Sequence, residues 1–123
     1  MTLATLMDAP TFDIGGFQAR SLAVPSRGST ELAVWSLEAA PGAATEWHTV
    51  DREEVFVLQE GKVLVEVGEQ VHELTAGDAA IATPGVPFRL RNPAAVAARL
   101  TVCTSKGMRG TVNGRTIDPP WAQ

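Results

Sequence analysis

Cysteine, histidine and tyrosine are scarce in this sequence, which has one, two and none of them among 123 residues. The lone Cys103 cannot form an internal disulfide, and its neighbours offer no metal-ligand spacing. We therefore expect Cys103 to be a small, buried strand residue. A chain of this length can bury a substantial apolar core and needs no such crosslinks to fold. We expect one domain stabilised by side-chain packing.

Long apolar runs are also absent, so no segment is suited to cross a bilayer as a helix. The first ten residues, MTLATLMDAP, lack the basic and apolar regions of a signal peptide, and we expect a cytoplasmic protein. The net charge is −4 and the basic residues are scattered, with only a local pair at Arg89 and Arg91. Without a basic patch or a tyrosine-containing stacking surface, binding to nucleic acid is not expected.

Short alternating runs dominate the rest of the chain, and no apolar pattern keeps a helical period for three turns. Gly68 and Glu69 separate two of these runs and predict a tight hairpin. Such runs, broken by turns every few residues, are typical of an all-β antiparallel sandwich or barrel. The predicted strands lie within residues 17–24, 31–39, 53–61, 62–68, 70–78, 79–85, 86–92 and 97–104.

We interpret residues 1–123 as a single domain with a barrel over residues 30–106. Residues 1–29 form a lead-in with one strand, and residues 107–123 form a tail. Two prolines extend the tail, and we expect Trp121 to anchor it against the barrel or a partner chain. Both chain ends could reach across an interface, so we expect a homodimer.

One motif carries a family resemblance. Gly42 is followed after five residues by His48, then Thr49 and Val50, and after three more residues by Glu54. Six residues later comes Gly61. This spacing resembles the first motif of the cupins, with Val50 in the place of that motif's second histidine.

A second motif follows in residues 77–92, GDAAIATPGVPFRLRN. It resembles the second cupin motif in the positions of Gly77, Gly85 and Asn92, with Thr83 in the proline position and Pro84 beside it. Phe88 stands where that motif has a histidine. Two motifs in order, with a hairpin between them, imply a cupin fold, the double-stranded β-helix or jelly-roll barrel.

The resemblance implies a divalent metal held by three histidines and one glutamate, of which this chain keeps only His48 and Glu54. Losing two direct ligands weakens metal binding severely, so we expect no metal and no other cofactor. If a metal site exists, Glu46 is the residue that could join His48 and Glu54. His72, the second histidine, lies before a turn and is expected to face solvent.

Strand alternation places three sets of side chains on the inward face of the expected barrel. The polar members, His48 and Glu54, are candidate catalytic residues. The apolar members are the candidate ligand-binding residues Val50, Phe56, Leu58, Phe88 and Leu90. Together they indicate an apolar pocket with few polar groups, which suits a small-molecule ligand.

Three functions remain open at this point. The first is a metal-independent enzyme of the isomerase, epimerase or cyclase kind, in which His48 transfers a proton and Glu54 orients it, or the reverse. The second is a binding module without chemistry, for sensing or storage. The third is a hydrogen-bonded pair that only closes a packed core. A metal-dependent cupin with an unusual ligand set is a further alternative.

Overall fold

The computed structural model describes residues 1–123 and contains twelve β-strands and two short 3-10 helices. The strands are β1 (Thr11–Ile14), β2 (Phe17–Ser21), β3 (Leu32–Ala39), β4 (His48–Val50), β5 (Glu54–Glu60), β6 (Val63–Val67), β7 (Gln70–Leu74), β8 (Ala79–Ala82), β9 (Arg89–Arg91), β10 (Ala98–Ser105), β11 (Gly110–Val112) and β12 (Arg115–Ile117). The helices are η1 (Pro25–Arg27) and η2 (Pro120–Ala122). No helix is long and apolar enough to cross a membrane.

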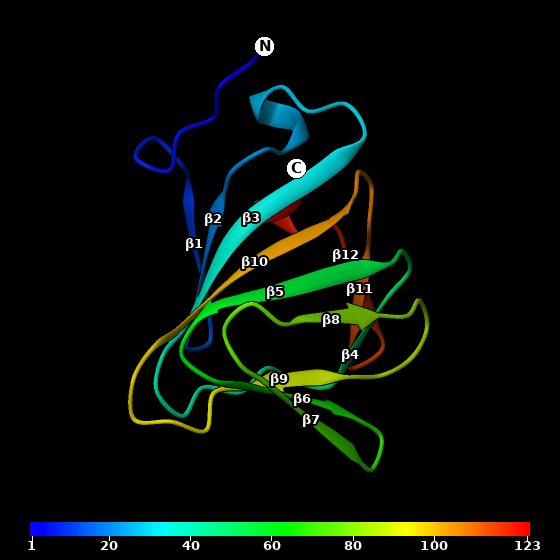
Figure 1. Cartoon of the computed structure of the whole chain (residues 1–123). Coiled ribbons are helices and arrows are strands. Elements are labelled where there is room, and N and C mark those ends of the chain that lie inside the picture. The colour runs from blue at the N-terminus through cyan, green and yellow to red at the C-terminus, as the bar shows by residue number, and fades with distance from the viewer.

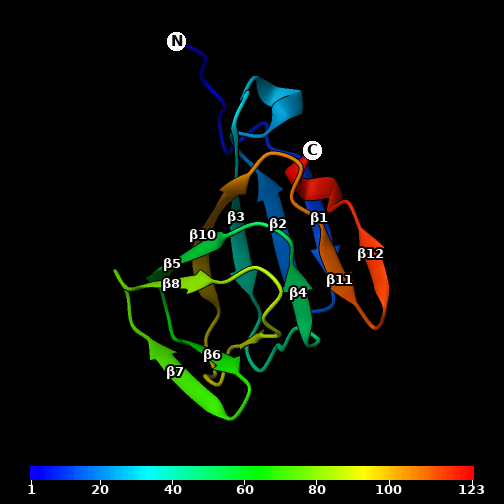
Figure 2. The same ribbon diagram turned by 90° about the vertical axis from the view of Figure 1, so that its right-hand side faces the viewer.

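Two antiparallel layers enclose the core (Figures 1 and 2). The first is a six-stranded sheet in the order β1-β2-β3-β10-β5-β8. The second consists of two three-stranded sheets, β12-β11-β4 and β7-β6-β9. Isolated bridges from Ala44 to Arg91 and from His48 to Phe88 join these smaller sheets. This arrangement is the predicted all-β jelly-roll barrel.

Each of the predicted strand segments contains an observed strand, and the hairpin at Gly68 is present, with Val67 opposite Gln70. The observed strands outside those segments are β1, β4, β11 and β12. All three residues of β12 are exposed, so this strand has no apolar alternation by which to recognise it.

The central strand β10 shows how alternation builds the core, because buried and partly exposed residues alternate along its whole length. Leu100, Val102 and Thr104 point inward and are buried. Cys103 belongs to the other face and is only partly buried, so the predicted full burial of this residue is wrong. Side chains alternate in direction along β10, and the neighbours Val102 and Thr104 face the core. The side chain of Cys103 therefore points to the opposite face of the sheet.

The lead-in and the tail both contribute to the barrel. The lead-in supplies β1 and β2, and β2 pairs with β3 of its own chain. The hydroxyl of Ser21 donates a hydrogen bond to the carbonyl of Trp121 at 2.7 Å, and that of Ser26 donates to Gln123 at 2.6 Å. Trp121 thus anchors the tail on the barrel. These segments pair within one chain, so they give no evidence of a dimer interface, and the homodimer stays a prediction. The cytoplasmic location also stays a prediction.

The fully buried Asn92 fastens the loops at one end of the barrel. Its side-chain nitrogen donates to the carbonyls of Ala39, Ala40 and Val96 at 3.1, 3.2 and 2.9 Å. Its side-chain oxygen accepts a hydrogen bond from the backbone N–H of Ala94 at 3.0 Å. One amide therefore satisfies four backbone groups, and Asn92 serves the fold, not a ligand site.

Gly61 begins the turn between β5 and β6, where the chain passes close to β10. A Cβ at this position would lie 2.9 Å from both the carbonyl oxygen of Ala97 and the Cα of Ala98, and the φ angle is +83°. Only glycine fits such a close approach in a left-handed conformation. The last glycine of the first motif is thus also a structural requirement.

Candidate functional site

A cavity of ≈ 360 Å³ lies between the six-stranded sheet and the β12-β11-β4 sheet. Of its 19 lining residues, 12 are hydrophobic. Phe17, Trp35 and Leu37 contribute from β2 and β3, while Val112 and Ile117 contribute from β11 and β12. The cavity is therefore walled by strands from both ends of the chain.

Five of the predicted catalytic and ligand-binding residues line this cavity: His48, Val50, Glu54, Phe56 and Leu90. They come from β4, β5 and β9, as strand alternation predicts. The structure therefore brings the candidate catalytic pair into one apolar space. Their catalytic and binding roles stay predictions.

The other two predicted ligand-binding residues, Leu58 and Phe88, do not line the cavity. Leu58 is 0 % exposed and belongs to the packed core. The ring of Phe88 contacts Phe56 edge-on at 5.7 Å between centroids, and it lies behind His48. Both side chains point inward as predicted, but Leu58 lies within the packed core, and Phe88 lines a second, smaller pocket of ≈ 60 Å³ together with Phe56.

Much of the cavity wall was not predicted from the sequence. Trp35 and Leu37 share the inward face of β3, and this alternation could have identified them. Met108, Val112 and Ile117 follow no such pattern, since they lie in or near short, mostly exposed strands. Their place in the wall depends on how β11 pairs with β4.

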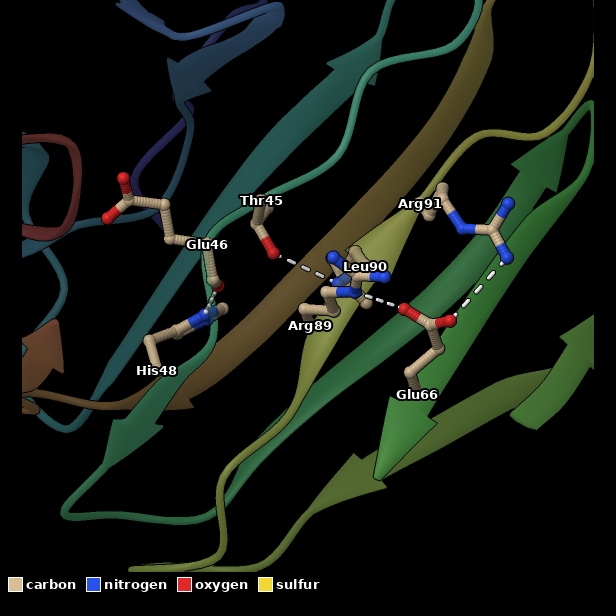
Figure 3. Close-up of polar contacts among 7 residues, drawn as sticks. All are labelled: Thr45, Glu46, His48, Glu66, Arg89, Leu90 and Arg91. Carbon is tan, nitrogen blue, oxygen red and sulfur yellow. Dashed lines mark hydrogen bonds and ion pairs between the residues drawn. The ribbon is translucent and has the colours of Figure 1, made fainter. Parts of the chain in front are cut away.

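The His48 ring is held by the backbone carbonyl of Glu46 and by the ring of Phe88. Its Nδ1 lies 2.7 Å from the carbonyl oxygen of Glu46 (Figure 3). Because a carbonyl can only accept, Nδ1 carries the proton and the neutral ring has its lone pair on Nε2. Phe88 packs against the ring at 4.3 Å between centroids with a 47° tilt. Burial lowers the pKa of His48, which the hydrogen bond to Glu46 partly opposes, so the neutral base is favoured.

Glu54, at the start of β5, is 4 % exposed, and no hydrogen bond is made by its carboxyl group. Burial raises the pKa of this carboxyl from 4.5 to about 8, so the neutral acid predominates at pH 7. No hydrogen bond joins it to His48, and the expectation that Glu54 orients the histidine is wrong. The carbonyl of Glu46 makes the orienting contact in its place.

The raised pKa of Glu54 predicts a pH dependence of stability. Between pH 4.5 and about 8 the unfolded chain releases this proton while the folded chain keeps it. The contribution of Glu54 to the free energy of unfolding is therefore complete below pH 4.5 and falls as the pH rises, by up to about 1.4 kcal/mol per unit. Urea denaturation from pH 5 to 8 should show a steeper loss for the native protein than for Glu54→Gln. Equal slopes in the two proteins would contradict the buried acid.

Glu46 lies at the rim of the cavity and is exposed. Its carboxylate accepts a hydrogen bond from the side-chain nitrogen of Asn113 at 2.9 Å, at the tip of the β11–β12 turn. Figure 3 shows this carboxylate turned away from the hydrogen bond between His48 and the Glu46 carbonyl. Thr45 helps to fix the segment, since its Oγ1 accepts a hydrogen bond from the backbone N–H of Leu90 at 2.9 Å.

The side chains do not fit a divalent metal. No three His, Cys, Asp or Glu side chains come together in a group that could hold one. Val50 and Phe88 are both buried and present hydrocarbon at the positions where the resemblance implies imidazoles. Glu46, His48 and Glu54 line one cavity without forming a ligand cluster. The alternative site predicted from these three residues is therefore not formed.

The two arginines of β9 are engaged outside the cavity. Arg89 and Arg91 both pair with Glu66 of β6, the latter at 3.5 Å (Figure 3). The hydrogen bond from Arg89 is the main cause of the lowered pKa of Glu66. The Arg89 guanidinium also lies 5.2 Å from the centre of the Trp47 ring. Neither arginine lines the cavity, so neither supplies it with positive charge.

Comparisons with known proteins agree with the fold described above. A family model described as "Cupin domain" matches residues 35–104. No curated protein matches the chain.

Several solved structures share the fold. An RmlC-like cupin from Shewanella frigidimarina is 24 % identical, with a TM-score of 0.73, covering 85 % of this chain and 90 % of that one. The polyketide cyclase RemF from Streptomyces resistomycificus is 17 % identical, with a TM-score of 0.77 and coverage of 98 % and 82 %. A sugar phosphate isomerase from Silicibacter pomeroyi is 16 % identical, with a TM-score of 0.74 and coverage of 94 % and 87 %.

Proposed function

This chain belongs to the cupin domain family, and we propose that it binds a compact organic molecule and transfers a proton on it without a metal. The observation that carries the proposal is the presence of His48 and Glu54 in the lining of one apolar cavity. At neutral pH one is a neutral base with a free Nε2, and the other is a neutral acid. An acid and a base in complementary states are what a proton-transfer reaction needs.

The proposed reaction begins with a substrate whose C–H bond lies next to a carbonyl group. Nε2 of His48 removes the proton, and the electron pair of the broken C–H bond moves to the carbonyl oxygen. Glu54 donates its proton to that oxygen, which leaves an enol between an imidazolium and a carboxylate. The carboxylate of Glu54 then takes back the enol O–H proton, and the electron pair of the enol C=C bond takes a proton from the His48 imidazolium. Protonation of the other face of the same carbon, after the enol has turned over, gives an epimer, and protonation of a conjugated carbon gives an isomer. The apolar walls exclude water from the enol.

Two proteins of similar fold support a reaction of this general kind. One is named as a polyketide cyclase and the other as a sugar phosphate isomerase. We propose an isomerase-like, epimerase-like or cyclase-like reaction for this chain on the basis of its own cavity. The names of these two proteins, a cyclase and an isomerase, are consistent with such a reaction.

Hydrogen–deuterium exchange at carbon tests the proposal directly. Tetralone is an uncharged bicyclic ketone with exchangeable hydrogens beside its carbonyl, and proton NMR in D₂O follows their loss. We expect the protein, after treatment with EDTA, to accelerate this exchange. Full activity that returns only when a divalent metal is added would contradict the metal-free mechanism. Metal analysis of the untreated protein provides the control.

A non-catalytic binding module is the second candidate. The observation in its favour is the small number of polar groups, since Thr45, Glu46, His48 and Glu54 are joined among the lining side chains only by the indole N–H groups of Trp35 and Trp121. Binding of tetralone without any acceleration of exchange would favour this alternative over the enzyme.

A further inference from the structure

The charge of the cavity lining restricts the ligand. No lysine or arginine is among the 19 lining residues. We propose that the cavity selects uncharged, compact ring compounds and rejects carboxylates and phosphates of similar size. This selectivity names the substrate class of the proposed function and rests on the assignment of this cavity as the site.

An anion that enters the cavity loses its hydration and meets no compensating cation. The two arginines nearest in sequence to the lining residue Leu90 are already paired with Glu66. At the rim the anion would also meet the exposed carboxylate of Glu46. Transfer of an unpaired charge into an apolar space is strongly unfavourable. The lining therefore acts against negatively charged ligands at the entrance and inside.

The shape and composition of the walls favour a ring system. Four aromatic side chains, Phe17, Trp35, Phe56 and Trp121, line the cavity. Aromatic side chains contact other rings favourably in stacked or edge-on geometry. The volume of ≈ 360 Å³ is near the lower end of the range of about 300–1,000 Å³ for small-molecule pockets, which favours a compact ligand.

The polar groups specify one acceptor and one donor on the ligand. The Nε2 lone pair of His48 accepts a proton or hydrogen bond, since Nδ1 is already used by the carbonyl of Glu46. The carboxyl group of Glu54 has no protein partner and remains free to bind a ligand oxygen. A phenol of one or two rings satisfies both without introducing charge, whereas a cyclic ketone accepts from Glu54 and presents only the C–H bond beside its carbonyl to Nε2 of His48.

A matched ligand pair tests this selectivity by calorimetry at pH 7, with no turnover required. We expect tetralone to bind at least about tenfold more tightly than carboxytetralone, which differs by one negative charge. Replacing Ile117 of the cavity wall by lysine should narrow or reverse the preference. Ile117 is 40 % exposed, so the fold should tolerate the charge. The control is Ile81→Lys on β8, where Ile81 is 66 % exposed and outside the cavity, and it should leave the preference unchanged.

Each result decides the proposal. Equal or tighter binding of carboxytetralone by the native protein, or no binding of tetralone, would overturn it. A preference that shifts equally in Ile117→Lys and Ile81→Lys would also overturn it, because the selectivity would then not arise in this cavity. If the expected preference is found but the protein never accelerates exchange, the proton-transfer function fails and the ligand class stands.

Discussion

Replacing His48 by glutamine is expected to lower the rate of proton exchange in tetralone by about 10²–10⁴-fold, the usual contribution of a general base. Glutamine has no basic nitrogen, so the C–H bond has no proton acceptor. Binding of tetralone should change much less, because the apolar walls remain. Proton NMR in D₂O gives the rate, and calorimetry gives the affinity.

His72→Gln is the matched control, since His72 is the only other histidine and is exposed on β7. This variant should exchange protons at the native rate. A native rate in His48→Gln would remove His48 from the mechanism.

The same reaction should show a bell-shaped pH dependence. The rate rises as His48 loses its proton, with a pKa below 6.5, and falls as Glu54 ionises near pH 8. In Glu54→Gln the fall at high pH should be absent.

Replacing Asn92 by alanine is expected to lower the free energy of unfolding by about 2–4 kcal/mol. The buried amide bonds to four backbone groups, and alanine would remove all four hydrogen bonds and open a small void. An unsatisfied buried polar group costs about 1–3 kcal/mol, and partial access of water to the loops limits the sum. Urea denaturation at pH 7 measures the change.

The control for this variant is Asn113→Gly, at the only other asparagine. Asn113 is exposed and has a φ of 51°, which glycine adopts without strain. We expect a change within about 0.5 kcal/mol, as is usual at the surface. Equal losses in the two variants would mean that the Asn92 hydrogen bonds do not stabilise the barrel.

The sequence predicts the barrel and the inward direction of the candidate pair because both depend on local rules. Alternation with period two places Glu54, Phe56 and Leu58 on one face of β5, and all three are buried. The motif positions of Gly61 and Asn92 mark a close backbone approach and a hydrogen-bonded clamp.

Alternation predicts whether a side chain points inward, but it does not predict the position of that side chain along the barrel axis or the residues that pack against it. Leu58 and Phe88 face inward like Phe56, yet only Phe56 reaches the cavity. The orientation of His48 is also hidden from the sequence, since it depends on the backbone carbonyl of Glu46 and not on a side chain. The walls from β11 and β12 depend on pairing between segments far apart in the chain.

The docking of the tail on the lead-in has a consequence for how the cavity forms. The hydrogen bond from Ser21 to Trp121 joins residues 100 positions apart, and Met108, Ile117 and Trp121 all contribute to the wall. Contacts between such distant segments form slowly, because a long loop must close first. During synthesis the sheets from β2 to β10 can assemble before these residues emerge from the ribosome. We therefore expect the cavity wall to be completed last, after most of the barrel is already in place.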